Sequence, residues 1–249
     1  MNIDIFKLLQ VTPHLKSLEL IKLHVHSSPI NATPIDLPRL TKLVIRDVEY
    51  GLLFACVTFP SLNNLTADPV QYQELSTEIV WSRLQVPAAI TTLRINCSTY
   101  YRRHMIFISG LDETQTHSLS LREYTTPTRS ISMIQALCNA SLASVTSLSI
   151  GRGASEVAQL PSTQICVLIS QLPHLRCLGL LPSRFSLTAM KHLRDHPLIC
   201  LELRVLGLAV VCETCEEVFE LLWGLVTHTL GTKGSVPGWD IASTLQGNG

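Results

Sequence analysis

The stretch HLKSLEL, residues 14–20, places Leu15, Leu18 and Leu20 at the spacing L-x-x-L-x-L. Apolar or near-apolar runs with this spacing recur along the chain at intervals of 22 to 30 residues. The first positions of the eight runs are Leu15, Leu40, Leu62, Ile90, Thr116, Val145, Leu175 and Leu198. Two runs depart from the pattern, with Thr116 at a first position and Ala67 at a third. A short strand that returns about every 20–29 residues is typical of stacked α/β repeats.

Between these runs the apolar period lengthens to that of a helix. The pattern predicts helices over 3–10, 52–57, 71–85, 131–142, 162–172, 187–195 and 216–230. In four units a proline stands two residues before the first leucine, at Pro13, Pro38, Pro60 and Pro173. Proline ends a helix and favours an extended predecessor, so each unit consists of helix, proline turn and strand. For the segment Met105–Ile108 the pattern leaves strand and helix equally open.

These units predict an α/β fold, a leucine-rich-repeat-like solenoid with parallel strands on its concave face and helices on its convex face. We expect it to span residues 1–230 as about eight irregular repeats, incomplete at both ends. Residues 231–249 are rich in Gly and Ser, which predicts a disordered tail. The central leucines should be buried on adjacent parallel strands in sequence order. They are Leu18, Leu43, Leu65, Leu93, Leu119, Leu148, Leu178 and Leu201.

Composition excludes several classes of function. The 249 residues carry 19 Lys and Arg against 19 Asp and Glu, so no basic field favours nucleic-acid binding. The longest apolar run, Val205–Cys212, is too short to span a membrane, and the first ten residues lack the apolar core of a signal peptide. Eight cysteines scattered through apolar segments suit reduced thiols. We therefore expect a cytoplasmic or nuclear protein.

The amino-acid sequence of several repeats resembles that of a known protein family. The stretches VTPHLKSLEL (11–20), IDLPRLTKLVIRDVEYGLLF (35–54) and SQLPHLRCLGLLP (170–182) are similar to the leucine-rich-repeat region of F-box-like proteins from basidiomycete fungi. The likeness covers roughly residues 1–230. It implies that the repeats present substrate to an SCF-type ubiquitin ligase, which the F-box engages through an adaptor. We expect the F-box itself to be absent here, so an SCF adaptor is a partner only if an upstream F-box exists.

Three motifs are candidates for chemical activity or metal binding. A single pair, Cys212 and Cys215, lacks the second pair that a structural zinc site needs. His192 and His196 lie one helical turn apart, but without the glutamate of a zinc-protease motif, and an exposed pair is the commoner outcome. Gly151 and Gly153 lack the third glycine of a dinucleotide loop. The sequence therefore predicts no enzyme activity, no metal and no cofactor.

The leading hypothesis is a non-catalytic protein–protein interaction module, whose concave face binds an unidentified protein partner. The residues expected to contribute are Arg46, Asp68, Arg94, Asn96, Arg122 and Arg204. We expect Arg94 and Arg122 on neighbouring strands, where they would hold an acidic segment of the partner. Solvation of both, or pairing of one with Asp68, is the alternative. Two other classes stay open, a free-standing repeat scaffold or truncated F-box-like fragment without a ligase role, and an enzyme whose site is assembled from loops.

Overall fold

The computed structural model describes residues 5–22, 34–46, 50–68, 86–100, 103–125, 134–135, 137–138, 142–152, 162–180, 184–196, 199, 201–208 and 220–221. The helices are α1 (Ile5–Val11), α2 (Tyr50–Cys56), the 3₁₀ turn η1 (Val86–Ala89), α5 (Ser162–Ser170) and α6 (Arg184–Asp195). The strands are β1 (Ser17–Ile21), β2 (Ile35–Asp36), β3 (Lys42–Arg46), β4 (Val57–Thr58), β5 (Asn64–Asp68), β6 (Thr92–Tyr100), β7 (Arg103–Leu111), β8 (Ser118–Thr125), β9 (Ser147–Arg152), β10 (Cys177–Leu180) and β11 (Val205–Leu208).

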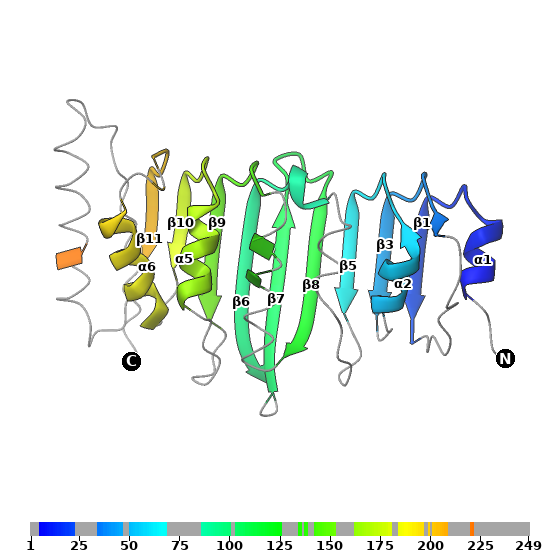
Figure 1. The fold of residues 1–249 in the computed structure, drawn as a ribbon, viewed down its shortest axis with the longest axis horizontal. Coiled ribbons are helices and arrows are strands. Elements are labelled where there is room, and N and C mark those ends of the chain that lie inside the picture. The colour runs from blue at the N-terminus through cyan, green and yellow to red at the C-terminus, as the bar shows by residue number, and fades with distance from the viewer. Residues whose placement is uncertain are drawn as a thin grey trace.

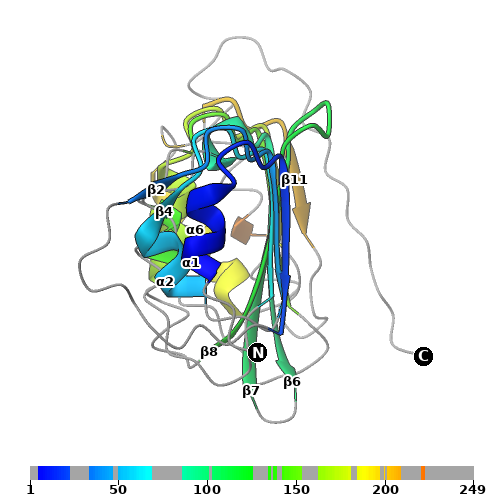
Figure 2. The same ribbon diagram turned by 90° about the vertical axis from the view of Figure 1, so that its right-hand side faces the viewer.

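The fold is α/β, built on one large and mostly parallel sheet (Figure 1). Nine strands form it in the order β1-β3-β5-β8-β7-β6-β9-β10-β11, and β2 pairs with β4 separately. The helices α1, α2 and α6 lie on one side of this sheet (Figure 2). No helix in the described ranges is both long and apolar enough to cross a membrane.

Alternation along the strands creates the core. Leucine at the central position of successive strands is fully or nearly buried on the helix side, from Leu43 (0% exposed) to Leu178 (1%). The registers align these positions across the sheet, for example Leu43 with Leu65 and Leu148 with Leu178. Such a row buries apolar surface continuously from strand to strand, which is the main favourable term in folding. The predicted burial of the central leucines is therefore confirmed in six strands, while Leu18 at the sheet edge is only partly buried. The prediction that these strands lie side by side in sequence order was wrong for β6 and β8.

The last predicted strand is displaced by five residues. Leu201 lies in a turn and is 56% exposed, so its predicted burial was wrong. The strand is instead β11, where Leu206 pairs with Leu178 and is 1% exposed. A second run with the same spacing, Leu203, Leu206 and Leu208, overlaps the first one and supplies this strand.

The strand order also departs from sequence order in the middle of the sheet. The segment that could be strand or helix is strand β7, which runs antiparallel between β6 and β8. Consequently β8 pairs with β5, and β6 pairs with β9. Strands β6, β7 and β8 are longer than their neighbours and extend past them in Figure 1.

One glycine explains how β7 fits the core. Gly110 pairs with Leu93 and Leu119, so it occupies the position that leucine holds in most of the other strands. A Cβ atom there would lie 2.7 Å from Cγ2 of Ile90, which is itself fully buried. The side chain of Ile90 therefore takes the place of the missing leucine.

Hydrogen bonds join successive units where the strands begin. The carbonyl of Lys16 accepts from the backbone N–H groups of Thr41 and Lys42, at 2.9 and 3.2 Å. The same double acceptance recurs at Thr41, Thr91, Thr146 and Arg176. Because these units repeat the bond to their neighbours, the starts of the parallel strands that they join are held at one level.

The predicted helices 3–10, 52–57, 162–172 and 187–195 overlap α1, α2, α5 and α6. In α6 the buried Ala189, Met190 and Leu193 face the core while Lys191 and Arg194 are exposed, which is the amphipathic pattern of a surface helix. The described residues of 131–142 and 216–230 include helical positions. The predicted helix 71–85 and tail 231–249 lie outside the described residues.

Candidate functional site

Alternate strand residues point away from the helices and form the outer sheet face. It consists of Ser17, Glu19, Ile21, Lys42, Val44, Arg46, Asn64, Thr66, Asp68, Thr92, Arg94, Asn96, Met105, Phe107, Ser109, Leu111, Ser118, Ser120, Arg122, Ser147, Ser149, Gly151, Cys177, Gly179, Val205 and Gly207. Most of these residues are exposed or half-buried, although Val44 and Gly151 are buried. The side chains in its central rows are short and polar. The hydroxyl of Ser118 on β8 donates to Oδ1 of Asn64 on the neighbouring strand β5 at 2.8 Å.

Two of the predicted residues form an ion pair on this face. Nη1 of Arg122 lies 3.3 Å from Oδ2 of Asp68, and the two side chains are 47% and 36% exposed. Arg46 stands beside Asp68 in the register of β3 and β5. One carboxylate therefore lies between two arginines, which is the pairing weighed as the alternative to partner binding. An ion pair this exposed contributes about 0–1 kcal/mol to stability.

Arg94 is separate from this group, and the expectation that it neighbours Arg122 was wrong. The inserted strand β7 lies between β6 and β8, so the strands that carry the two arginines lie about 10 Å apart. The residues aligned with Arg94 are Ser109 and Ser149. Arg94 is exposed and has no ion pair within the described part of the chain.

The insertion also adds apolar side chains that the sequence pattern did not place on this face. Phe107 lies between Asn96 and Arg122 in the register, and both Phe107 and Met105 are half-buried. The missed signal is the alternation of Met105, Phe107 and Ser109 with the buried Ile106 and Ile108. That alternation has the period of a strand, but the run had no place in a series of parallel repeats.

Arg204 lies off the outer sheet face, because it precedes β11 instead of lying within it. Its backbone N–H donates to the carbonyl of Arg176 at 2.8 Å. Beside it, Glu202 accepts from Nδ1 of His174 at 2.8 Å and from Nε of Arg176 at 3.1 Å. These two hydrogen bonds lower the pKa of Glu202. The cluster is a small exposed network at the sheet edge where the strands begin.

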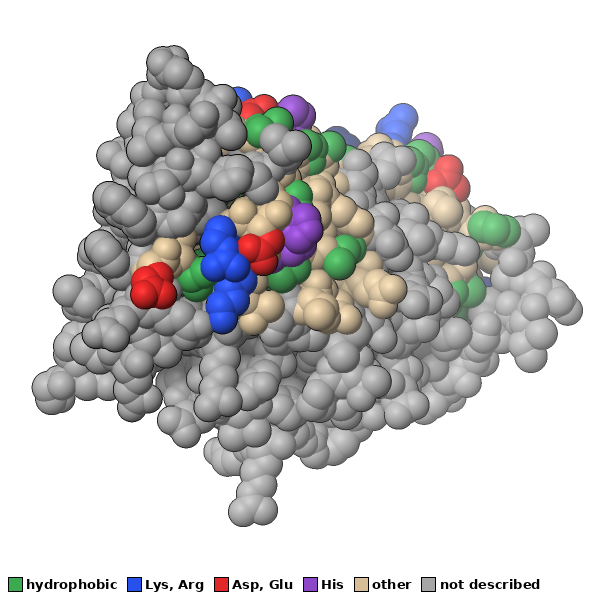
Figure 3. Space-filling view, turned by 60° about the vertical axis from the view of Figure 1, so that its left-hand side comes forward, with side chains coloured by type: hydrophobic (Ala, Val, Ile, Leu, Met, Phe, Trp, Pro, Cys, Tyr) green, Lys and Arg blue, Asp and Glu red, His purple; other side chains and the backbone are tan. Residues whose placement is uncertain are grey.

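On the opposite side of the molecule, α5 and α6 border a shallow groove of about 580 Å³. Its lining includes Cys166, Ser170, Lys191, His192 and Asp195. Figure 3 brings this side forward and shows histidine, acidic and basic side chains close together on the surface. The imidazoles of His192 and His196 lie 4.6 Å apart between ring centroids.

The hydrogen bonds in this groove do not activate a nucleophile. Ser170 donates its only hydroxyl proton to the carbonyl of Cys166 at 2.8 Å, so its oxygen accepts from Nε2 of His192 at 3.0 Å. Desolvation and the nearby His196 lower the pKa of His192, which favours the neutral ring. Asp195 accepts from Nε of Arg194 at 2.8 Å instead of orienting the imidazole. The pair therefore lacks the order of contacts found in serine hydrolases.

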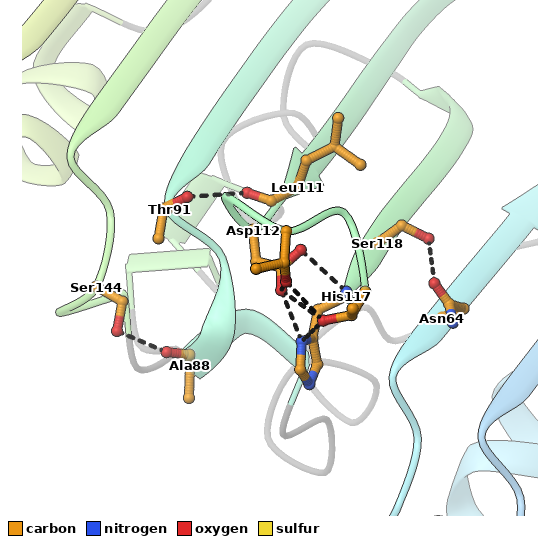
Figure 4. Close-up of polar contacts among 10 residues, drawn as sticks. Asn64, Ala88, Thr91, Leu111, Asp112, His117, Ser118 and Ser144 are labelled. Carbon is orange, nitrogen blue, oxygen red and sulfur yellow. Dashed lines mark hydrogen bonds and ion pairs between the residues drawn. The ribbon is translucent and has the colours of Figure 1, made fainter.

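A third polar cluster closes the hairpin between β7 and β8 (Figure 4). The carboxylate of Asp112 accepts from the hydroxyls of Thr114 and Thr116, both at 2.7 Å, and from the backbone N–H of His117 at 3.1 Å. Nδ1 of His117 lies 3.0 Å from the same carboxylate. Although partial burial opposes ionisation, these hydrogen bonds hold the pKa of Asp112 well below its usual range. The cluster orders a loop in which Gln115 has a positive φ of 57°.

Cys56, Cys138, Cys166 and Cys177 are free thiols. Burial raises the pKa of Cys138 to about 11 and also raises that of Cys166. A protonated, buried thiol is a poor nucleophile and a poor metal ligand. Within the described ranges no three His, Cys, Asp or Glu side chains are grouped to hold a metal. Cys212, Cys215 and Gly153 lie outside the described residues.

The chain matches no known protein-family model, and comparisons with curated proteins and with solved structures found no match.

Proposed function

We propose that this protein is a non-catalytic protein–protein interaction module that binds its partner on the outer sheet face. The observation that carries the proposal is the contrast between the two sides of the sheet. One side is a buried row of leucines, interrupted at Gly110 and covered by helices, and the other presents short polar side chains, exposed arginines and Phe107. Extended sheet faces of this kind are what repeat proteins use for binding.

We further propose that the units stack as a leucine-rich-repeat-like solenoid, with the outer sheet face on its concave side. The recurring parallel registers and the repeated hydrogen bonds at the strand starts support it. The resemblance to F-box-like proteins then suggests substrate recognition for an SCF-type ubiquitin ligase in the cytoplasm or nucleus. The alternative is a free-standing scaffold or a fragment without a ligase role. Co-purification of an SCF adaptor with the natural protein would favour the first, and its absence the second.

The interaction proposal is tested by blocking each side of the molecule. Ser120→Trp with Ser149→Trp places two large side chains in the central row of the outer sheet face, while Gln171→Trp places one at the groove of the helix side. We expect the double variant to lose partners that the parent captures from the source organism, as quantified by mass spectrometry. Retention of every partner by the double variant, with loss only in Gln171→Trp, would contradict the proposal. Circular dichroism must show that both variants fold.

A further inference from the structure

We propose that the partner segment is an extended acidic peptide with one large apolar side chain that seats on Phe107, between Arg94 and Arg122. This inference rests on the proposed function and specifies the chemistry of its partner. Three features of the outer sheet face carry it: its charge, the placement of Phe107, and the short polar side chains around both.

The charge of the face is unbalanced although the whole chain is neutral. Among the described residues its cations are Lys42, Arg46, Arg94 and Arg122, and its anions are Glu19 and Asp68. Asp68 is already engaged by Arg122. Neither Arg94 nor Lys42 has an ion pair within the described part of the chain. A segment that carries carboxylates is complementary to such a surface. Arginine is the side chain best suited to bind a carboxylate, because it can donate two parallel hydrogen bonds to it.

Phe107 supplies an apolar contact between these charged side chains. It aligns with Arg122 on one side and Asn96 on the other, and Arg94 stands two residues before Asn96 on β6. Met105 follows on the same side of β7. Interfaces draw most of their energy from a few aromatic and arginine side chains surrounded by weaker polar contacts. The arrangement of Arg94, Phe107 and Arg122 has this composition.

The neighbouring residues permit close approach of an extended chain. In the row that contains Arg94, the aligned positions are Thr66, Ser120, Ser109 and Ser149. Their hydroxyls are short and can donate to or accept from a peptide backbone. A single-stranded nucleic acid is less favoured, because it needs a longer track of cations and several stacking rings.

The test is selection of binders from a random 12-residue peptide library displayed on phage against the parent chain. We expect enriched peptides to carry several Asp or Glu and one aromatic or large aliphatic residue. In fluorescence anisotropy, Arg94→Glu with Arg122→Glu should weaken these peptides about tenfold or more, because each charged hydrogen bond is worth roughly that factor. Phe107→Ser should remove the advantage of the apolar residue over serine in the peptide. Arg176→Glu, on the edge of the sheet, is the matched control and should bind as the parent does.

The inference fails if no peptide is enriched, if enriched peptides are neutral or basic, or if they bind the double-glutamate variant as tightly as the parent. It also fails if a labelled 12-residue oligouridine binds the parent and competes with the peptides, since the face would then recognise nucleic acid. Unchanged melting temperatures of the variants exclude misfolding as the cause of lost binding. If the paired tryptophan block abolishes capture while the charge reversal does not, the proposed function stands and this inference alone is wrong.

Discussion

Gly110 is the residue at which the leucine row is interrupted. Its missing side chain leaves the space that Ile90 fills, with Cγ2 of Ile90 only 2.7 Å from the position of a Cβ atom. We predict that Gly110→Ala lowers the free energy of unfolding by about 1–3 kcal/mol, as overpacked core substitutions do. Urea denaturation measures the change.

Gly179→Ala is the matched control for this substitution. The nearest atom to its added Cβ is Oγ of Ser149 at 3.5 Å, which is ordinary contact. We expect its stability to stay within about 0.5 kcal/mol of the parent, as for most surface changes. Equal effects of the two alanines would show that Ile90 does not occupy the site beside Gly110.

Asp112 gives the hairpin loop a defined pH dependence. Since hydrogen bonds lower its pKa in the folded state, its contribution to stability is present above the unfolded pKa of about 4 and is lost as pH falls through the folded value. We predict that Asp112→Asn lowers the melting temperature at pH 7, because the amide nitrogen cannot accept the hydrogen bonds of a carboxylate oxygen. The difference from the parent should shrink as pH falls below about 4.

Thermal unfolding of both proteins between pH 2.5 and 7 checks this prediction. The control is Glu113→Gln, an exposed neighbour in the same loop. A difference between Asp112→Asn and the parent that stays constant with pH would contradict the assigned role of the carboxylate.

At the scale of elements, two overlapping leucine runs could form the last strand, one that begins at Leu198 and one that begins at Leu203. We predict that Leu206→Ala costs about 2–5 kcal/mol, as buried leucine truncations do, and that Leu148→Ala costs a similar amount. Both residues are 1% exposed. Leu201→Ala should cost about 0.5 kcal/mol or less, because Leu201 is 56% exposed. Denaturation midpoints that reverse this order would restore the register 198–203 for the strand.

Much of this architecture could be predicted from the spacing of apolar residues. The period of L-x-x-L-x-L located seven strands of the large sheet, and the prolines located the turns that precede several of them. The eighth strand was misplaced because Leu198 and Leu203 both begin runs with the required spacing. Local pattern cannot choose between overlapping runs, since the choice depends on which leucines reach the neighbouring strand.

The antiparallel place of β7 between β6 and β8 was missed for a related reason, since the pattern left this segment open between strand and helix. Thr116 breaks the pattern because β8 is entered from a hairpin loop, where its hydroxyl donates to Asp112. A polar first position was therefore a sign of a different connection, not a weak copy of the repeat. Without β7, the sequence placed Arg94 beside Arg122 and left Phe107 off the outer sheet face.

At the scale of the whole molecule, the sheet separates two surfaces of different character. The helix side carries the groove with His192, whose contacts suit a structural role. The outer sheet face carries the arginines and Phe107 with few internal partners. We therefore expect binding to depend on the outer sheet face and stability on the helix side of the same sheet.

Site-specific photo-cross-linking tests this division most directly. A benzophenone amino acid is placed at Thr66 on the outer sheet face in one sample and at Gln171 on the helix side in another, and cells of the source organism are irradiated. We predict specific protein adducts from position 66 and none above background from position 171. The same partner cross-linked at position 171 and not at position 66 would contradict the central claim that the outer sheet face is the binding surface.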